Sequence, residues 1–205
     1  MSETPQILND NSDVPLFPLT MPLMPGCHLP LRIFEPRYLD MISSCLKSNN
    51  PFTIVQTKGK TEPSVQSDLE IFSVGTQASI VDFDQGKDGC LSISVVGIRR
   101  VSIEASHQLD SGLWVARNTP LEERGSAPED ELNTLKNLLE KLLQHHMVKS
   151  MSDAVDYESS EQIMNYLIML LPFTAHMKQA LLETDHHGLR WQGLVEAISR
   201  LEASS

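Results

Sequence analysis

Residues 75–103 constrain the fold of this chain more than any other stretch. Two apolar runs, at 78–83 and 91–96, flank a cluster of turn-forming residues at 84–89. The second run alternates apolar residues with serines, which is the period-two pattern of a half-buried strand. A chain with this arrangement is predicted to form a β-hairpin here.

The turn and the end of this hairpin also have sequence signals. Asp88-Gly89 provides the positive φ that a tight hairpin turn requires. Gly97 is expected to end the second strand, and residues 99–103 are expected to start a third. We therefore predict a β-meander, which needs further strands or a helix over its apolar face to be stable.

The residues before the meander predict a mixed set of short elements. Pro15 and Pro18 cannot donate hydrogen bonds to a ladder, so the first strand is expected to be at an edge or to be short. Pro36 suits the first turn of a helix, and an apolar face follows at helical spacing: Tyr38, Met41, Ile42, Cys45 and Leu46. The other expected elements are strands at 14–19, 52–56 and 113–116, an extended piece at 29–34, and an exposed, mobile loop at 57–68.

The apolar period changes from two to about 3.6 after residues 118–128. A leucine stripe predicts a helix over residues 132–143. Capping-box spacing at Ser126/Glu129 and at Ser159/Gln162 predicts two helix starts, and Thr174 is a further candidate cap. Gly188 is expected to break the third helix, and a last helix is expected at 189–201.

These patterns predict an α+β fold in two parts. We expect a disordered polar tail at 1–12, a β-rich domain with one helix at 13–119, and a helical bundle at 120–205. With 205 residues the chain is long enough to bury a large core.

The bulk composition limits the classes of partner. A formal net charge of −11 disfavours nucleic acid and anionic membrane surfaces, which are bound mainly through Lys and Arg. No apolar run reaches the ~18 residues that a membrane span needs, and the N-terminus lacks the pattern of a secretory signal. Cys27, Cys45 and Cys90 form no CxxC pair, which indicates buried thiols in a reducing cytoplasm.

No motif for catalysis, cofactor binding or metal binding is complete. Gly59-Lys60-Thr61 ends like a phosphate-binding loop, but position 54 is Ile inside a predicted strand, so the glycine-rich cradle is missing. The seven histidines show no zinc-ligand spacing, and no GxSxG elbow is present. We therefore predict no catalytic, cofactor-binding or metal-binding residues and no cofactor.

Several short motifs, taken in order, resemble the N-terminal, substrate-binding domain of Lon protease. They are Val14-Pro15-Leu16-Phe17-Pro18-Leu19, Pro25-Gly26, the run at 29–38, Gly75-Thr76, Asp88-Gly89, Gly97 with Arg100, and Leu170-Leu171-Pro172. The resemblance covers about residues 13–202 and is closest to stand-alone Lon-domain proteins. It implies a twisted β-barrel of the PUA type joined to a helical bundle. Lys87-Asp88-Gly89 faintly resembles the Lon nucleophile motif, but the Pro-Ser-Ala-Gly that should follow is absent.

Six residues are candidates for a peptide-binding site: Phe34, Glu35, Arg37, Tyr38, Arg99 and Arg100. They could line a groove that reads a peptide's backbone or charge. The competing interpretation is structural, with Glu35 at the start of the helix and one arginine joining the meander to that helix. For the four charged residues the structural interpretation is favoured.

The resemblance implies a non-enzymatic module for unfolded or extended polypeptide that lacks the Walker A loop and the Lon Ser-Lys motif. A groove near an edge strand, or at the junction of barrel and bundle, would bind the peptide. A protease acting in trans is a further partner that the resemblance allows. The alternatives are an RNA-binding PUA-like module and a small-molecule-binding protein with a pocket between the two parts. The sequence does not define the oligomeric state.

Overall fold

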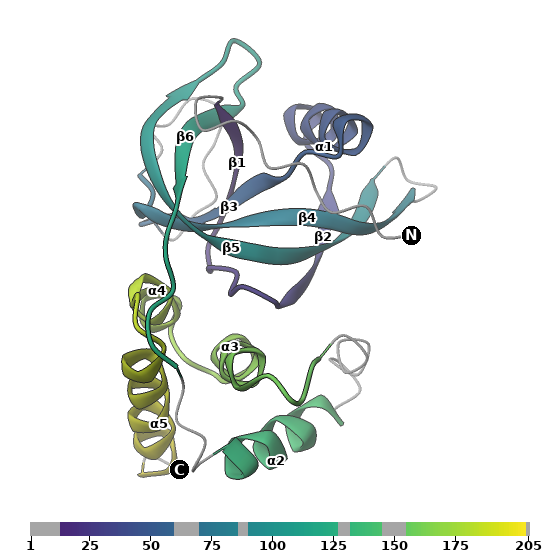
Figure 1. Ribbon diagram of the computed structural model, residues 1–205. Coiled ribbons are helices and arrows are strands. Elements are labelled where there is room, and N and C mark those ends of the chain that lie inside the picture. Colours follow the sequence, from purple (N-terminus) through teal and green to yellow (C-terminus); the bar gives the residue numbers. More distant parts are fainter. Residues whose placement is uncertain (1–12, 60–69, 86–89, 127–131, 145–154, 204–205) are drawn as a thin grey trace.

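A computed structural model describes residues 13–59, 70–85, 90–126, 132–144 and 155–203. Figure 1 shows a curved sheet on one side of the molecule and a layer of helices on the other. The strands are β1 (Val14–Leu19), β2 (His28–Ile33), β3 (Phe52–Gln56), β4 (Val74–Gln85), β5 (Leu91–Gln108) and β6 (Trp114–Pro120). The helices are α1 (Pro36–Ser48), α2 (Leu132–Leu143), α3 (Ser160–Leu170), α4 (Ala175–Glu183) and α5 (His187–Ala203). The predicted α+β class is confirmed.

The sheet closes into a barrel. Its strand order is β2-β5-β4-β3-β1-β6, and an additional β5–β6 pairing closes the ring β5-β4-β3-β1-β6. The β1–β3 pair is parallel, and the other pairs are antiparallel. Strand β2 lies outside this ring because its only strand partner in the described sheet is the first part of β5.

The expected break at Gly97 is wrong, because β5 continues through it to Gln108. The third strand predicted at 99–103 is the second half of β5, so the antiparallel meander is β4-β5-β6, with β6 as its third strand. Gly97 is needed for close approach. A Cβ at this position would lie 2.7 Å from the carbonyl oxygen of Met24, and the backbone of Gly97 bonds to Gly26 and Cys27. The predicted Asp88-Gly89 turn and most of the 57–68 loop lie outside the described residues.

The first strand was expected to be at an edge or to be short; β1 has six residues and a strand partner on each side. β1 pairs with β6 only at Val14 and Pro15, and it pairs with β3 from Leu16 to Leu19. Because each ladder uses a different part of the strand, the two prolines are accommodated between two partners.

Helix α1 follows the predicted pattern. Glu35 is its N-cap residue, Pro36 begins it, and Asn49 ends it in the left-handed region with φ of 51°. The buried face contains Tyr38, Met41, Ile42 and Cys45, whereas Leu46, which was assigned to the same face, is exposed. The helix lies against the barrel on the side away from the helical layer (Figure 1).

Two helices of the C-terminal half begin at the N-cap residues that the sequence predicts. The side chains of Ser159 and Thr174 accept hydrogen bonds from the backbone N–H groups of Gln162 and Met177. The capping box at Ser159 is only half formed, since the Gln162 amide oxygen accepts from Asp156 N instead. The Ser126/Glu129 box lies partly outside the described residues.

The expected break at Gly188 is wrong. Helix α4 already ends at Glu183 with Thr184 as its C-cap, and α5 begins at His187, so Gly188 lies inside its first turn. In the described chain no helix is both long and apolar enough to cross a membrane.

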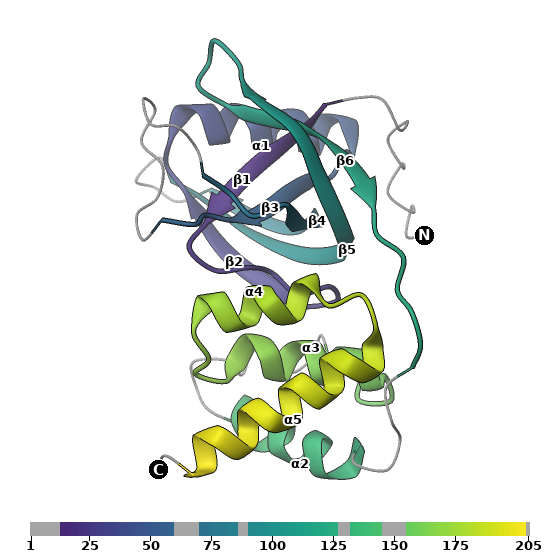
Figure 2. The ribbon, with the colours of Figure 1, turned by 90° about the vertical axis from the view of Figure 1, so that its left-hand side faces the viewer.

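One apolar core extends through barrel and helices. Buried residues of the barrel and of α1 belong to the same cluster as the buried faces of α2, α3, α4 and α5. Polar contacts accompany it: the Tyr166 hydroxyl accepts from His28 N, and Asn165 Nδ2 donates to Pro25 O at 2.9 Å. The chain leaves β6 and runs down one side of the molecule into the helical layer (Figure 2). The division into 13–119 and 120–205 as separate domains stays a prediction.

The buried Tyr166 makes the shared core sensitive to high pH. Burial raises the pKa of its hydroxyl to about 12, above the ordinary tyrosine value of about 10. The stability contributed by the neutral phenol is complete below about pH 10 and is lost as the pH rises toward about 12. We expect Tyr166→Phe to show a smaller fall in the free energy of unfolding between about pH 8 and about pH 11 than the wild type. Urea unfolding at both pH values measures this, and an equal fall in both proteins would contradict it.

Candidate functional site

The six candidate residues fall in two separate regions. Phe34, Glu35, Arg37 and Tyr38 lie where β2 ends and α1 begins. Arg99 and Arg100 lie in the middle of β5, and neither lines the cavity described next. The structure therefore does not bring all six candidates to one groove.

A cavity of about 220 Å³ lies between the end of β1, the strand β2 and the start of α1. We call it the β1–β2 cavity; it is lined by residues 17–19, 30–35, 37 and 38. Its floor is aromatic, since the rings of Phe17 and Tyr38 pack with their centroids 4.6 Å apart and both side chains are buried. Phe34 stands at the rim and is 64% exposed. The cavity is mostly apolar and open to a large side chain.

Two of the three charged side chains that line this cavity, Glu35 and Arg37, are paired with each other, and the third is the exposed Arg32. Arg37 Nε donates to Glu35 Oε2 at 2.9 Å, and Arg37 Nη1 donates to the carbonyl of Gly112 at 3.1 Å. The guanidinium also lies over the ring of Tyr38. Arg37 thus joins α1 to the turn between β5 and β6, which gives Glu35 and Arg37 structural contacts of the kind expected. The arginine that makes this link is Arg37 of α1 and not an arginine of β5.

The side of β2 that faces away from β5 is an open edge. His28 N donates to the Tyr166 hydroxyl, whereas the carbonyl of Cys27 accepts from Gly97 N on β5. Successive residues of an antiparallel strand turn their backbone groups to opposite sides, so Pro30 and Arg32 turn theirs away from β5. Pro30 lacks an N–H, and in this orientation its presence leaves the β5 ladder intact. In the described sheet no strand pairs with this side of β2.

Arg99 has a local structural partner. It is half-buried, and its Nε donates to Gln77 Oε1 at 2.8 Å on the neighbouring strand, where Gln77 is its register partner. This pair holds β4 to β5 beside a register shift.

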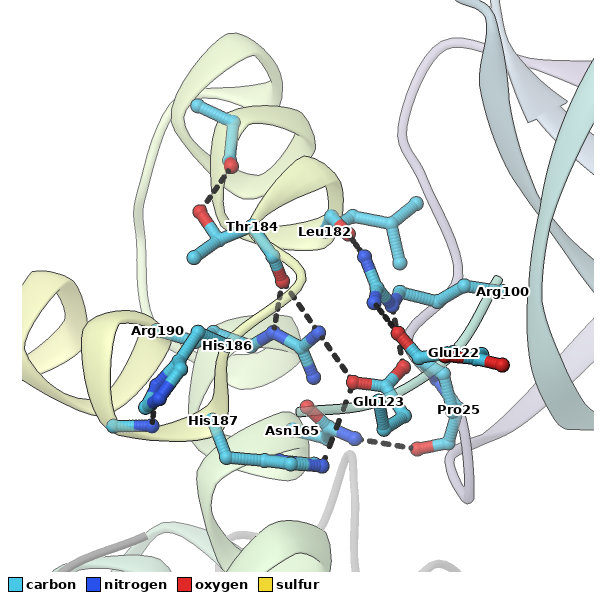
Figure 3. Close-up of polar contacts among 12 residues, drawn as sticks. Pro25, Arg100, Glu122, Glu123, Asn165, Leu182, Thr184, His186, His187 and Arg190 are labelled. Carbon is cyan, nitrogen blue, oxygen red and sulfur yellow. Dashed lines mark hydrogen bonds and ion pairs between the residues drawn. The ribbon is translucent and has the colours of Figure 1, made fainter. Parts of the chain in front are cut away.

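Arg100 lies in a buried polar cluster at the junction of barrel and helices (Figure 3). We call the cluster of Arg100, Glu123, His187 and Arg190 the junction cluster. Arg100 is fully buried; its Nε donates to Glu123 Oε1, and its Nη1 donates to the carbonyl of Leu182 at 2.9 Å. Arg190 Nη2 donates to Glu123 Oε2 at 2.9 Å, and His187 Nε2 lies 3.4 Å from the same oxygen.

Glu123 therefore provides the anion for two buried arginines from different halves of the fold. Burial lowers the pKa of the Arg190 guanidinium, and the adjacent Glu123 carboxylate acts in the opposite direction. Glu123, which belongs to the segment between β6 and α2, was not among the candidate residues predicted from the sequence. No local motif marks it, because its partners come from β5 and α5.

The burial of the three cysteine thiols agrees only in part with the expectation. Cys27 and Cys45 are buried, and burial raises the pKa of both, to about 11 for Cys45. Cys90 is only partly buried, so the expectation that all three are buried is wrong for it. Among the residues that the structure describes, no three His, Cys, Asp or Glu side chains are placed to hold a metal ion.

Residues 13–200 match the family model of the ATP-dependent protease La (LON) substrate-binding domain. The chain belongs to this Lon family. A crystal structure of a Lon N-terminal domain protein from Xanthomonas campestris is 27% identical, with a TM-score of 0.70, and the match covers 90% of this chain and 98% of that one. The N-terminal domain of a Mycobacterium avium complex Lon protease has the same fold, with a TM-score of 0.61 at 19% identity over 90% of this chain and 97% of that one.

Two longer Lon relatives match part of their length. Lon protease 1 of Bdellovibrio bacteriovorus is 30% identical over 136 residues, which are 63% of this chain and 17% of that protein. The Lon protease of Buchnera aphidicola is 22% identical over 193 residues, which are 89% of this chain and 24% of that protein. The chain therefore spans a quarter or less of the curated relatives it matches.

We expect the free energy of unfolding to depend strongly on the carboxylate of the junction cluster. Glu123→Gln should lower the free energy of unfolding by about 2 kcal/mol, because Arg100 and Arg190 would remain buried without an anion. This value is below that for a fully buried pair, since the Glu123 side chain is 29% exposed. Glu122→Gln is the matched control: it removes the same charge from the neighbouring residue, whose described contact to Arg100 uses the backbone carbonyl. Urea unfolding of the two variants measures the difference, and equal stabilities would contradict the role of Glu123.

Proposed function

We propose that this chain is a non-enzymatic module that binds unfolded or extended polypeptide at the β1–β2 cavity. The observation that carries the proposal is the open edge of β2 beside an apolar cavity, in a chain that belongs to a family described by its substrate binding. The open edge of β2 would bind the backbone of the polypeptide, and the cavity would bind one of its side chains.

The backbone of the polypeptide would extend the sheet at β2. An extended segment that adds to a sheet edge gains main-chain hydrogen bonds regardless of its sequence, and pockets beside the edge select its side chains. Here Pro30 and Arg32 turn their backbone groups toward that side, and residues 30–33 also line the cavity. An added strand would therefore lie directly over the cavity.

The size of the cavity favours one side chain over a whole small molecule. Its volume of about 220 Å³ is below the roughly 300–1,000 Å³ that is typical of sites for small molecules and cofactors. Phe17, Leu31, Ile33 and Tyr38 provide apolar contacts for a large aliphatic or aromatic residue. Burying such a residue would contribute about 1.5–3 kcal/mol.

No reaction is part of this proposal. The carboxylate of Glu35 at the cavity is held by Arg37, so it is not positioned as a general base. Capture of polypeptide without nucleotide hydrolysis is the activity we assign, and a protease acting in trans is the proposed downstream partner. Cys27 and Cys45 are buried thiols outside any disulfide, which supports a cytoplasmic location.

Nucleic acid and membrane surfaces are not proposed as partners. Arg37, Arg100 and Arg190 are buried and bonded inside the fold, so they add nothing to a basic face, and the formal net charge is −11. A salt-sensitive gel shift with RNA would favour the PUA-like alternative over polypeptide binding.

The proposal predicts saturable binding of a labelled, permanently unfolded protein without ATP, measured by fluorescence anisotropy. Phe34→Asp should weaken this binding at least tenfold, because it places a charge at the rim of the apolar cavity. Phe83→Asp is the matched control, since Phe83 is 58% exposed but does not line the cavity. Equal weakening by both changes, or no binding by the wild type at high micromolar concentration, would overturn the proposal.

A further inference from the structure

A second cavity of about 380 Å³ lies on the same side of the barrel. It is formed by the residues at the start of β1, by α1, by the residues before β3 and by the turn between β5 and β6. Its apolar surface includes Met41, Pro51 and Leu113, and its carboxylates are those of Asp13 and Asp40. We call it the acidic cavity.

The acidic cavity and the β1–β2 cavity lie next to each other, and β1 and α1 contribute residues to both. On β1, Pro15 lines the acidic cavity and Phe17 lines the other, and residues two apart in a strand share a face. On α1, Arg37 is followed at helical spacing by Met41 and Ser44 on one stripe. Between the two cavities, Arg37 donates to the carbonyl of Gly112, next to Leu113.

The negative charge of the acidic cavity favours a cationic ligand. None of its lining residues is Lys or Arg. The Asp40 side chain forms no ion pair or hydrogen bond with the described part of the chain, whereas Asp13 has a contact of 3.7 Å to His107. Two exposed carboxylates above an apolar floor complement a side chain with an aliphatic stem and a cationic end.

We propose that the acidic cavity binds a Lys or Arg side chain of the same polypeptide whose apolar residue fills the β1–β2 cavity. This inference rests on the proposed function and adds the chemistry of the segment that the module prefers. Pro15 lines the acidic cavity and residues 17–19 line the β1–β2 cavity, so the cavities are two to four residues apart along β1, which is roughly 7–13 Å at the rise of a strand. Residues two or four apart in an extended segment share a face, so the preferred segment has its basic residue two or four positions from its apolar one.

The test uses two labelled peptides that differ only in one amide. Both contain one Leu, and a Lys four residues away on either side, which lies on the same face of an extended segment, is free in one peptide and acetylated in the other. Acetylation keeps the aliphatic stem and removes the charge. We expect the wild type to bind the free lysine peptide about fivefold more tightly at low salt, and this preference to shrink as ionic strength rises.

Asp40→Asn should reduce the preference from about fivefold to about twofold, because only the Asp13 carboxylate remains, while binding of the acetylated peptide stays unchanged. Asp84→Asn is the matched control, because it removes one exposed carboxylate from β4 and leaves the cavity intact. Both positions are exposed, so neither change is expected to unfold the protein.

The outcomes separate the two proposals. Equal binding of both peptides by the wild type would overturn the acidic cavity as a cation site and leave the polypeptide-binding proposal standing. Equal loss of the preference in Asp40→Asn and Asp84→Asn would overturn the assignment to this cavity. Absence of binding by either peptide, together with a flat titration of unfolded protein, would overturn both proposals.

Discussion

Strand β5 pairs with β2, β4 and β6, and the shape of the molecule depends on this. A strand has two edges, and β4 occupies one of them along most of the length of β5. The other edge is divided, since β2 pairs with it from Leu91 to Val96 and β6 pairs with it from Val101 onward. Gly97 lies at the change of partner, where the absence of a side chain lets β5 pass against the loop that precedes β2.

The division of β5 explains why a binding edge exists in an otherwise closed barrel. The ring closes through β6, so β2 is left with β5 on one side and no strand of the described sheet on the other. Open edges invite pairing with other chains. In β2 the edge is short, contains Pro30 and borders an apolar cavity, which would limit pairing to segments that can fill the cavity.

Charge is distributed unevenly between the inside and the outside of the protein. Arg37, Arg100 and Arg190 are buried in structural contacts, and Glu123 joins two of them across the junction of the barrel and the helices. Many of the carboxylates stay at the surface, including those of Asp13 and Asp40 at the acidic cavity. The arrangement that stabilises the fold therefore also leaves an acidic exterior beside the proposed polypeptide site.

Local patterns in the sequence determined the class of the fold and most of its elements. Period-two and period-3.6 apolar runs located the strands and helices, and the caps at Ser159 and Thr174 were readable because each acts within one helical turn. The tertiary structure decided what depends on distant residues. Whether Gly97 ends a strand or permits close approach depends on Met24, and whether Arg100 binds peptide or holds the fold depends on Glu123 and Leu182. Burial and pairing between segments far apart in the chain have no local signature, so only the folded structure separates these roles.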